Sequence, residues 1–343
     1  MPKLLFDRGP DHQPISWTMR GPDGLTVLRR IATGLALCVL LLPLTVGLAA
    51  LSGLDHRWPD VLAQFPAPAL SATVVFAVIL LLLRLRLAAL GALVVIVVLI
   101  IALWPQAAAD RGKARAGAPV ITLYSANIHY LNDDAAKIRA SIEAANPDVI
   151  VLIETSRGVL GHLDTVLAGY PYRRISIASD RLGGRDAAVV ASRYPMTIRR
   201  ETNEDSIFVL TTLDSPLGRL NIMGAHLTRP WPYQIQWEQI RQAENLATLM
   251  TYVEGPTIVA GDFNSVSSGR IGRQIHRETG LTAAPGWPGT WPAQVPPWLA
   301  VTIDQVWRTP DLAIVSRKVG KSTGSDHWPV VTRITLAEPR PAP

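Results

Sequence analysis

Polar side chains follow apolar segments at several places in the last two thirds of this 343-residue sequence, where they could carry out chemistry. The residues concerned are Asn127 after TLYSA, Glu154 after DVIVLI, His226 after LNIMGA, Asp262 and Asn264 after TIVAG, Asp304 within AVTIDQVW, and Asp326 and His327 in GSDHWPVV. Each residue alone has a structural explanation, such as a turn or a buried histidine. Because functional groups in sheet proteins gather at strand ends on a rigid scaffold, the set predicts one site.

The residue types indicate which chemistry such a site could perform. Carboxylate and amide oxygens suit Mg²⁺ or Mn²⁺ rather than zinc, and the two histidines could transfer protons or neutralise phosphate charge. In GDFN, Asp262 and Asn264 are two positions apart, so on an extended chain their side chains point the same way. The sequence has no G-x-S-x-G, H-E-x-x-H or Walker lysine motif. The single cysteine, Cys38, excludes a cysteine-rich zinc site and an intramolecular disulfide.

Short apolar segments alternate with helical patterns and predict the elements that position these side chains. Strands are expected at 120–126, 148–153, 187–192, 207–213, 220–225, 257–260, 301–307, 312–315 and 329–334. Helices are expected at 135–145, with Asn132 as the cap, and at 233–252. Strands outnumber helices and often follow one another, which favours a sandwich of sheets with helices outside over a doubly wound sheet.

The first third of the chain differs in composition from the rest. The whole sequence is 48% hydrophobic and 17% charged, and three stretches, 31–54, 61–83 and 87–109, contain no charge. Each is long enough for a membrane helix of about 20 residues, although Pro66 and Pro68 move the helical start of the second to about 69. A buried hairpin in a large soluble core is the alternative interpretation. A cleavable signal peptide fits poorly, because mostly polar residues precede the first stretch and two more stretches follow it.

The distribution of basic residues predicts an orientation for these three helices. Lys3, Arg8, Arg20, Arg29 and Arg30 precede the first helix, and Arg84 and Arg86 separate the second from the third. Both segments are therefore expected in the cytoplasm, with the chain after Trp104 on the other side, although Arg111, Lys113 and Arg115 oppose this. No long Lys/Arg block suggests a nucleic-acid-binding stripe, and the excess of Arg over Lys suggests a GC-rich genome.

The ordered motifs SANIHY, VIVLIET, GGRDAAVVASRYP, GAHLTRP, GDFN, TIDQVW and SDHWPV resemble those of the endonuclease/exonuclease/phosphatase superfamily. The resemblance covers about residues 118–336, and GDFN and SDHWPV are its most specific parts. It implies an α/β fold, a four-layer sandwich of two β-sheets flanked by helices, here preceded by three transmembrane helices. The expected organisation is a cytoplasmic tail at 1–30, an anchor at 31–104, a linker at 105–118, a catalytic domain at 119–336 and a tail at 337–343.

The resemblance also implies roles at the metal and at the attacking water. Glu154 would be the main ligand of Mg²⁺ or Mn²⁺, assisted by Asn127 and Asp326. Asp262 would position or deprotonate the water, and Asn264 would stabilise the transition-state oxyanion.

At the phosphate, the resemblance implies that His327 contacts the scissile group and that Asp304 orients its ring. His226 would hold another phosphate oxygen. Abasic-site endonucleases place a tyrosine between the Glu and GDFN motifs. This sequence departs from that pattern, since it has no clear counterpart, although Tyr170 or Tyr172 could serve. No DNA-inserting loop is apparent.

The resulting expectation is a multi-pass protein of a bacterial inner membrane, anchored in the lipid bilayer by three helices, with its catalytic domain in the periplasm. It would hydrolyse phosphodiester bonds in a phospholipid head group, a nucleic acid or a phosphorylated glycan, so nucleic acid is a partner only as substrate. Phosphomonoesterase activity and a non-catalytic, membrane-tethered binding module are the alternatives. The tryptophan- and proline-rich segment 286–298 is either an aromatic lip at a lipid interface or an ordered loop packed on the sandwich.

Overall fold

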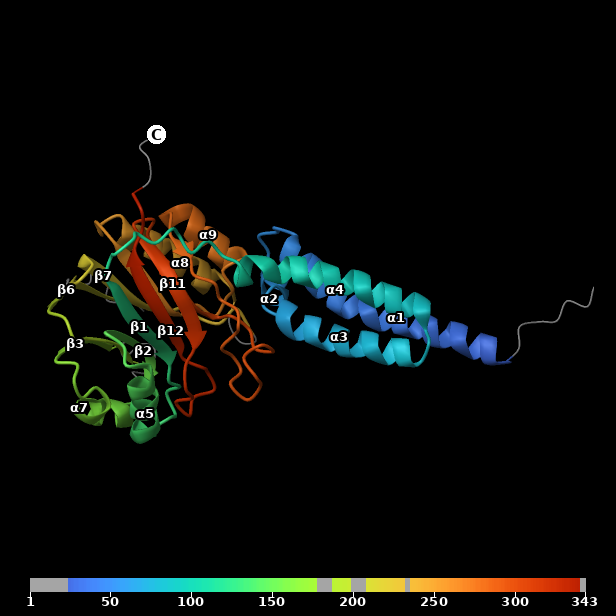
Figure 1. Cartoon of the computed structure of the whole chain (residues 1–343), viewed down its shortest axis with the longest axis horizontal. Helices are drawn as coiled ribbons and strands as arrows, with labels where there is room; N and C mark the ends of the chain where they lie inside the picture. The colour runs from blue at the N-terminus through green and yellow to red at the C-terminus, as the bar shows by residue number, and fades with distance from the viewer. Residues whose placement is uncertain (1–23, 178–186, 199–207, 232–234, 340–343) are drawn as a thin grey trace, which may run out of the picture.

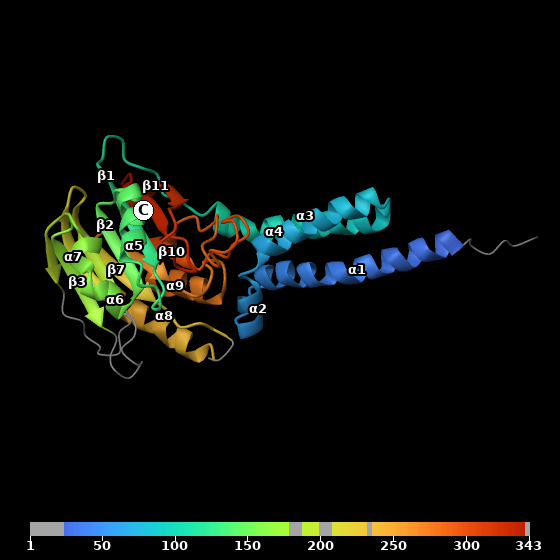
Figure 2. The ribbon, with the colours of Figure 1, turned by 90° about the horizontal axis from the view of Figure 1, so that it is seen from below.

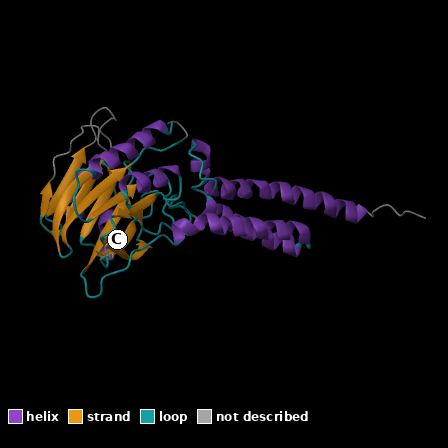
Figure 3. Cartoon of the chain, turned by 90° about the horizontal axis from the view of Figure 1, so that it is seen from above, coloured by secondary structure: helices purple, strands orange, loops and turns teal. Residues whose placement is uncertain are grey.

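A computed structural model describes residues 24–177, 187–198, 208–231 and 235–339 of the chain. A bundle of helices forms one end of the molecule, and the strands and remaining helices form the other (Figures 1 and 3). The helices of the bundle are α1 (Gly24–Leu51), α2 (Arg57–Leu62), α3 (Pro66–Leu82) and α4 (Arg86–Ala107). The three apolar stretches of the sequence therefore form α1, α3 and α4.

Length and composition distinguish the three long helices of the bundle. Both α1 and α4 are long and apolar enough to cross a membrane, whereas α3 has 17 residues. At 1.5 Å per residue, α3 spans about 26 Å, slightly less than the roughly 30 Å of a bilayer's hydrocarbon core. The structure thus gives two helices of spanning length, and the third predicted span is a shorter apolar helix that begins at Pro66.

Small residues allow the bundle helices to approach closely. Ala88 and Ala92 of α4 are fully buried, and a Cβ on Gly91 would lie 2.9 Å from a methyl carbon of Leu37 in α1. Large apolar side chains such as Leu82 point outward instead and are exposed. Packing through small residues with large apolar residues outside is typical of helices that associate in lipid.

The other end of the molecule is a sandwich of two six-stranded sheets, as the sequence predicts. The first sheet has the order β11-β12-β1-β2-β4-β3, with β1 (Val120–Asn127), β2 (Val149–Thr155), β3 (Tyr172–Ile177), β4 (Ala187–Ser192), β11 (Leu312–Val319) and β12 (Val330–Leu336). The second has the order β5-β6-β7-β8-β10-β9, with β5 (Met196–Ile198), β6 (Phe208–Ser215), β7 (Gly218–His226), β8 (Thr257–Asp262), β9 (Thr282–Ala283) and β10 (Asp304–Arg308).

Helices cover the outer face of each sheet. Apolar side chains of both sheets meet in a central core, where Val151 of β2 and Ile222 of β7 are fully buried. The first sheet packs outward on α5 (Ala135–Ala145), α6 (Arg157–Gly161) and α7 (Leu163–Val166). The second packs outward on α8 (Trp237–Met250) and α9 (Arg270–Thr279). The fold is therefore α/β, with two mixed sheets between layers of helices.

Several predicted boundaries differ from the structure for local reasons. Asp134, not Asn132, caps α5, because its carboxylate accepts a hydrogen bond from Lys137 N at 2.9 Å. Helix α8 begins at Trp237 rather than at position 233, which lies outside the described residues. Strand β3 escaped prediction because its sequence, YRRISI, lacks a continuous apolar run. Helix α4 continues to Ala107, so it includes the first three positions of the predicted linker.

Candidate active site

Two parallel strand pairs bring the predicted polar residues to one edge of the sandwich. β1 runs parallel to β2 and β7 runs parallel to β8, so Asn127 and Glu154 end one pair while His226 and Asp262 end the other. Asp304 begins β10 directly opposite Asp262 in the antiparallel register. The segment before β12 adds the remaining predicted residues, Asp326 and His327.

Glu154 lies at the open side of this group. Its Oε1 accepts a hydrogen bond from Asn127 Nδ2 at 2.9 Å and lies 3.4 Å from His226 Nε2. Its Oε2 accepts a longer bond, 3.4 Å, from the backbone N–H of Tyr130. The backbone of Glu154 is left-handed, with φ of 53°, beside an irregularity in the β2–β4 pairing. Such strain is seen where a functional side chain must leave the regular direction of its strand.

Asp262 lies deeper and is held at both carboxylate oxygens. Oδ1 accepts a hydrogen bond from the Asn264 backbone N–H at 2.8 Å, and Oδ2 accepts one from Asn127 Nδ2 at 3.0 Å. Burial, followed by the negative charge of Asp304, raises the pKa of Asp262 to about 6. Its carboxylate is therefore a stronger base than an ordinary aspartate and still ionised at neutral pH.

His327 and Asp304 form a buried carboxylate–imidazole pair. Nδ1 of His327 lies 2.8 Å from Asp304 Oδ2, while Nε2 faces Asp262, 3.8 Å from its Oδ2. Burial alone would lower the pKa of His327, but the charges of Asp304 and Asp262 and the hydrogen bond to Asp304 raise it to about 10. The ring is therefore an imidazolium at neutral pH, with one N–H directed to Asp304 and the other into the site.

The side chain of Asn264 is fixed by the segment that follows β7. Its Nδ2 donates to the Leu227 carbonyl at 2.8 Å, and its backbone is left-handed, with φ of 46°. An amide NH₂ carries two donor hydrogens, so one remains for a ligand. The Asn264 carbonyl accepts hydrogen bonds from two glutamines, Gln239 at 3.2 Å and Gln64 at 3.3 Å.

Asp326 lies near His327, whose pKa its charge helps to raise, but outside the two tightest groups of acidic and histidine side chains. Acidic and histidine ligand atoms approach one another within 4.8 Å in two sets, Glu154–His226–Asp262 and Asp262–Asp304–His327, and among the described residues neither set includes Asp326. The Asp326 carboxylate instead accepts a hydrogen bond from Trp291 Nε1 at 3.2 Å.

Two neighbours of the site were not singled out from the sequence. Thr290 Oγ1 accepts a 3.4 Å hydrogen bond from the backbone of Asp304, and Trp291 orients Asp326. Both belong to the segment 286–298, whose tryptophan and proline content was the available signal. Trp287 and Trp291 are partly buried in this segment, whereas Gln294, Pro296 and Trp298 are exposed, Trp298 to 52%, so the first part of the loop is packed on the sandwich and the part from 294 to 298 reaches the surface.

The donor set of this site fits a hard divalent cation. Glu154 and Asp262 bring two carboxylates together, and Asp304 has a buried Oδ1 without a hydrogen-bond partner in the described part of the chain. A cation would offset this concentration of negative charge, and oxygen-rich donors suit Mg²⁺ or Mn²⁺. Asn127 turns its NH₂ toward both carboxylates, because its Oδ1 accepts a 3.0 Å hydrogen bond from the His129 N–H.

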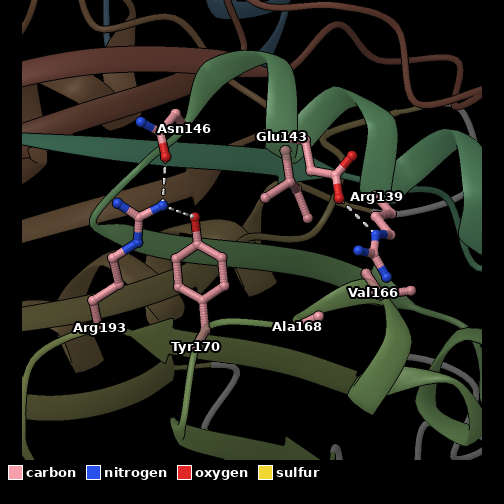
Figure 4. A pocket seen from close by; sticks show the side chains of 8 residues that line it. Arg139, Glu143, Asn146, Val166, Ala168, Tyr170 and Arg193 are labelled. Carbon is pink, nitrogen blue, oxygen red and sulfur yellow. Dashed lines mark hydrogen bonds and ion pairs between the residues drawn. The ribbon is translucent and has the colours of Figure 1, made fainter.

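Neither tyrosine considered from the sequence reaches this site. Tyr170 lies at the opposite end of the first sheet, where its hydroxyl donates to the Pro147 carbonyl at 2.7 Å. Figure 4 shows it lining a small depression in which Arg193 contacts Tyr170 and Asn146. Tyr172 begins β3 opposite Ser192, at the same far end. Neither residue therefore takes the place of the tyrosine of abasic-site endonucleases, because both lie at the end of the first sheet away from Glu154.

The sequence profile of the endonuclease/exonuclease/phosphatase family matches residues 124–327, more than half of the chain, from β1 to His327. The chain belongs to this family. Family members are divalent-metal-dependent phosphohydrolases, and the buried Asp/His site described above lies within the matched residues. No curated protein matches the chain at the level of sequence.

Solved structures of the endonuclease/exonuclease/phosphatase fold resemble the sandwich. A family protein from Bacteroides vulgatus has a TM-score of 0.51 and 16% identity, covering 64% of this chain and 99% of its own. The catalytic domain of human Nocturnin, with bound sulfate, has a TM-score of 0.50 and 20% identity, covering 64% and 94%. D. rerio TDP2, in complex with a single-strand DNA product, has a TM-score of 0.50 and 16% identity, covering 63% and 99%. At these identities the structural matches show a common fold and nothing more.

Proposed function

We propose that this family member is a membrane-anchored, divalent-metal-dependent hydrolase of phosphodiester bonds that acts outside the cytoplasm. The observation that carries the proposal is the buried arrangement of Asp262, His327 and Asp304, in which a carboxylate of raised pKa faces an imidazolium. A base and a cationic hydrogen-bond donor side by side are what hydrolysis of a phosphate ester requires.

Asp262 is the residue that would prepare the attacking water. Hydrogen bonds from Asn127 and from the Asn264 backbone fix its carboxylate, so it can orient a water molecule without moving. Its raised pKa allows the carboxylate to accept the proton as the water oxygen bonds to phosphorus.

Three side chains would bind the phosphoryl oxygens. His327 offers the N–H on Nε2, and Asn264 offers the second hydrogen of its amide. His226, at the open side beside Glu154, would hold another oxygen. Donors fixed in a buried site stabilise developing negative charge without rearranging, which is worth about 3–4 kcal/mol for one donor in comparable enzymes.

Glu154 would hold the divalent ion, Mg²⁺ or Mn²⁺, with Asp326 and Asn127 as the further ligands that the motifs assign. When bound, such an ion neutralises charge on the phosphoryl oxygens and stabilises the leaving oxygen. In the present geometry the Asn127 amide positions the Glu154 and Asp262 carboxylates, and its own carbonyl faces His129.

The helix bundle supports anchoring and its orientation. The start of α1 and the turn between α3 and α4 lie at the end of the bundle away from the sandwich (Figure 1). Arg29, Arg30, Arg84 and Arg86 are therefore grouped at that end, which is the cytoplasmic end by the positive-inside rule. The sandwich would then lie on the opposite side of the membrane. The proposal keeps the organisation expected from the sequence, with a tail at 1–30, an anchor at 31–104, a linker at 105–118, a catalytic domain at 119–336 and a tail at 337–343.

The experiment is hydrolysis of bis-(p-nitrophenyl) phosphate and p-nitrophenyl phosphate by the full chain, with EDTA and after addition of Mg²⁺ or Mn²⁺. We expect the diester to be cleaved faster, EDTA to abolish the activity and either ion to restore it. A preference for the monoester would indicate a phosphomonoesterase. Absence of activity on both esters would favour a binding module, and full activity without metal would overturn the mechanism.

A further inference from the structure

The helix bundle is attached to the sandwich by buried polar contacts as well as by the chain. Asp60 of α2 is 2% exposed, and its carboxylate accepts hydrogen bonds from Gln236 Nε2 and from the Arg270 backbone N–H. Gln106, near the end of α4, is 1% exposed and accepts a 2.6 Å bond from Thr302. Because breaking such bonds would leave buried polar groups unpaired, they hold the two parts in one relative position.

The same contacts reach the loops that surround the candidate active site. Gln64, two residues before α3, donates from Nε2 to the backbone carbonyl of Asn264 at 3.3 Å. The backbone carbonyl of Gln106 accepts hydrogen bonds from Gly286 at 2.6 Å and Trp287 at 3.2 Å, at the start of the loop that carries Trp291. Figures 1 and 2 show this loop, drawn in orange, between the strands and the near ends of α3 and α4.

In the proposed membrane arrangement, these contacts would hold the candidate site near the depth where the apolar helices leave the bilayer. Pro66 begins α3 only two positions after Gln64, and Trp104 lies in the last turn of α4. Trp58 of α2 is 56% exposed, Trp104 64% and Trp298, on the loop beside the site, 52%. Exposed tryptophans at helix ends are typical of the head-group region of a membrane.

The geometry points to a substrate that is itself held in the bilayer. We infer, on the basis of the proposed phosphodiesterase function and anchoring, that the site cleaves an amphiphilic phosphodiester whose phosphate lies at head-group depth in the leaflet nearest the sandwich. Water adds to phosphorus, the bond from phosphorus to one ester oxygen breaks, and that oxygen takes up a proton to leave as an alcohol. The apolar tail stays among the lipids throughout the reaction.

Two esters with the same scissile bond test this inference. The full-length protein, reconstituted in phosphatidylcholine vesicles, is given either hexadecyl p-nitrophenyl phosphate, which enters the bilayer, or ethyl p-nitrophenyl phosphate, which stays in water. Confinement to the protein's own bilayer raises the effective concentration of the ester, so we expect about tenfold or faster release of p-nitrophenol from the hexadecyl ester. Flotation of the protein with the vesicles tests anchoring separately.

Each outcome has one meaning. Equal rates for the two esters, or faster cleavage of a single-stranded oligonucleotide, would overturn the inference and leave the proposed phosphodiesterase intact. No cleavage of either ester or of bis-(p-nitrophenyl) phosphate would instead overturn the proposed function. The ratio of hexadecyl to ethyl rates should fall severalfold in Trp298→Ala. The ratio should be unchanged in the control Tyr172→Ala, because Tyr172 is an exposed aromatic residue on β3 at the far end of the first sheet.

Discussion

Asp304 and His327 are 23 positions apart in the sequence and act through one hydrogen bond. The negative charge of Asp304 raises the pKa of His327 and so keeps its ring protonated. The protonated ring is the form that can bind phosphate, so Asp304 extends to higher pH the range in which the site binds phosphate. The raised pKa also stabilises the fold: this contribution is complete below pH 6.5, the ordinary pKa, and is lost as pH rises through about 10.

Substitution of this pair should show their coupling. His327→Ala should lower kcat about a hundredfold or more, in line with a loss of roughly 3 kcal/mol of transition-state stabilisation. Asp304→Asn should cause a smaller loss and move the basic limb of the pH–rate profile to lower pH, because the pKa of His327 falls toward its ordinary value. The double mutant should lose less than the product of the two single losses. Losses that simply multiply, or near-normal single mutants, would rule out the pairing.

A second prediction for a single residue concerns Glu154. Glu154→Gln keeps the shape of the side chain but removes the charge, so the Mg²⁺ concentration needed for half-maximal activity should rise by about tenfold or more, or turnover should disappear. Activity measured over a Mg²⁺ titration tests this. Glu143→Gln, an exposed glutamate of α5 paired with Arg139, is the matched control and should behave like the unmodified protein. An unchanged Mg²⁺ requirement in Glu154→Gln would remove Glu154 from the metal site.

At the scale of elements, the parallel pair β7–β8 places His226 and Asp262 side by side. Strands β7 and β8 can approach this closely only because Gly261 has no side chain. Its φ is 147°, and a Cβ there would lie 2.0 Å from the Ala225 carbonyl oxygen. The glycine of GDFN is thus required by strand packing next to the site.

Gly261→Ala should therefore separate the two strand ends. We expect a loss of stability of about 1–3 kcal/mol from overpacking, together with a large loss of kcat, measured by thermal unfolding and by bis-(p-nitrophenyl) phosphate hydrolysis. Gly161→Ala is the control, since a Cβ at Gly161 meets nothing within 4 Å and its backbone is not left-handed. Normal stability and activity of Gly261→Ala would contradict the requirement for glycine at this position.

At the scale of the whole molecule, the proposed arrangement puts the apolar bundle in lipid and the α/β sandwich in water. Exposed leucines, valines and isoleucines cover α1, α3 and α4, and arginines gather at the end away from the sandwich. The orientation in the membrane decides which phosphate esters the site meets, because a site outside the cytoplasm does not encounter chromosomal DNA.

Fusions test this orientation. A reporter that is active only outside the cytoplasm should be active when joined after Pro343 and inactive when joined at Arg84, since the positive-inside rule keeps the arginine-rich turn in the cytoplasm. A cytoplasmic reporter should give the opposite pattern. Reversal of both results would place the site in the cytoplasm and restore intracellular nucleic acids as substrates.

The sequence by itself determined the elements whose patterns are local. Apolar runs such as DVIVLI and TIVAG predict buried strands, one in each sheet. The polar residues that end them fall at one edge of the sandwich, where the parallel pairs β1–β2 and β7–β8 both end. The apolar stretches of the first third predict the bundle in the same way. Strand β3 and helix α9 were not predicted. The sequence of β3, YRRISI, has no continuous apolar run, and α9 has only Ile271 and Ile275 as buried apolar side chains, one turn apart.

Only the tertiary structure decided which distant surfaces meet. Gln64 and Asn264 are 200 positions apart, and Asp60 and Arg270 are 210 apart, so no periodicity in the sequence relates them. The turning of the Asn127 amide toward two carboxylates, and the distance of Tyr170 from Glu154, likewise depend on the assembled sheets. Local patterns report whether a residue is buried, whereas the partner of a buried polar group is chosen by the packing of the whole chain, which must satisfy every such group at once.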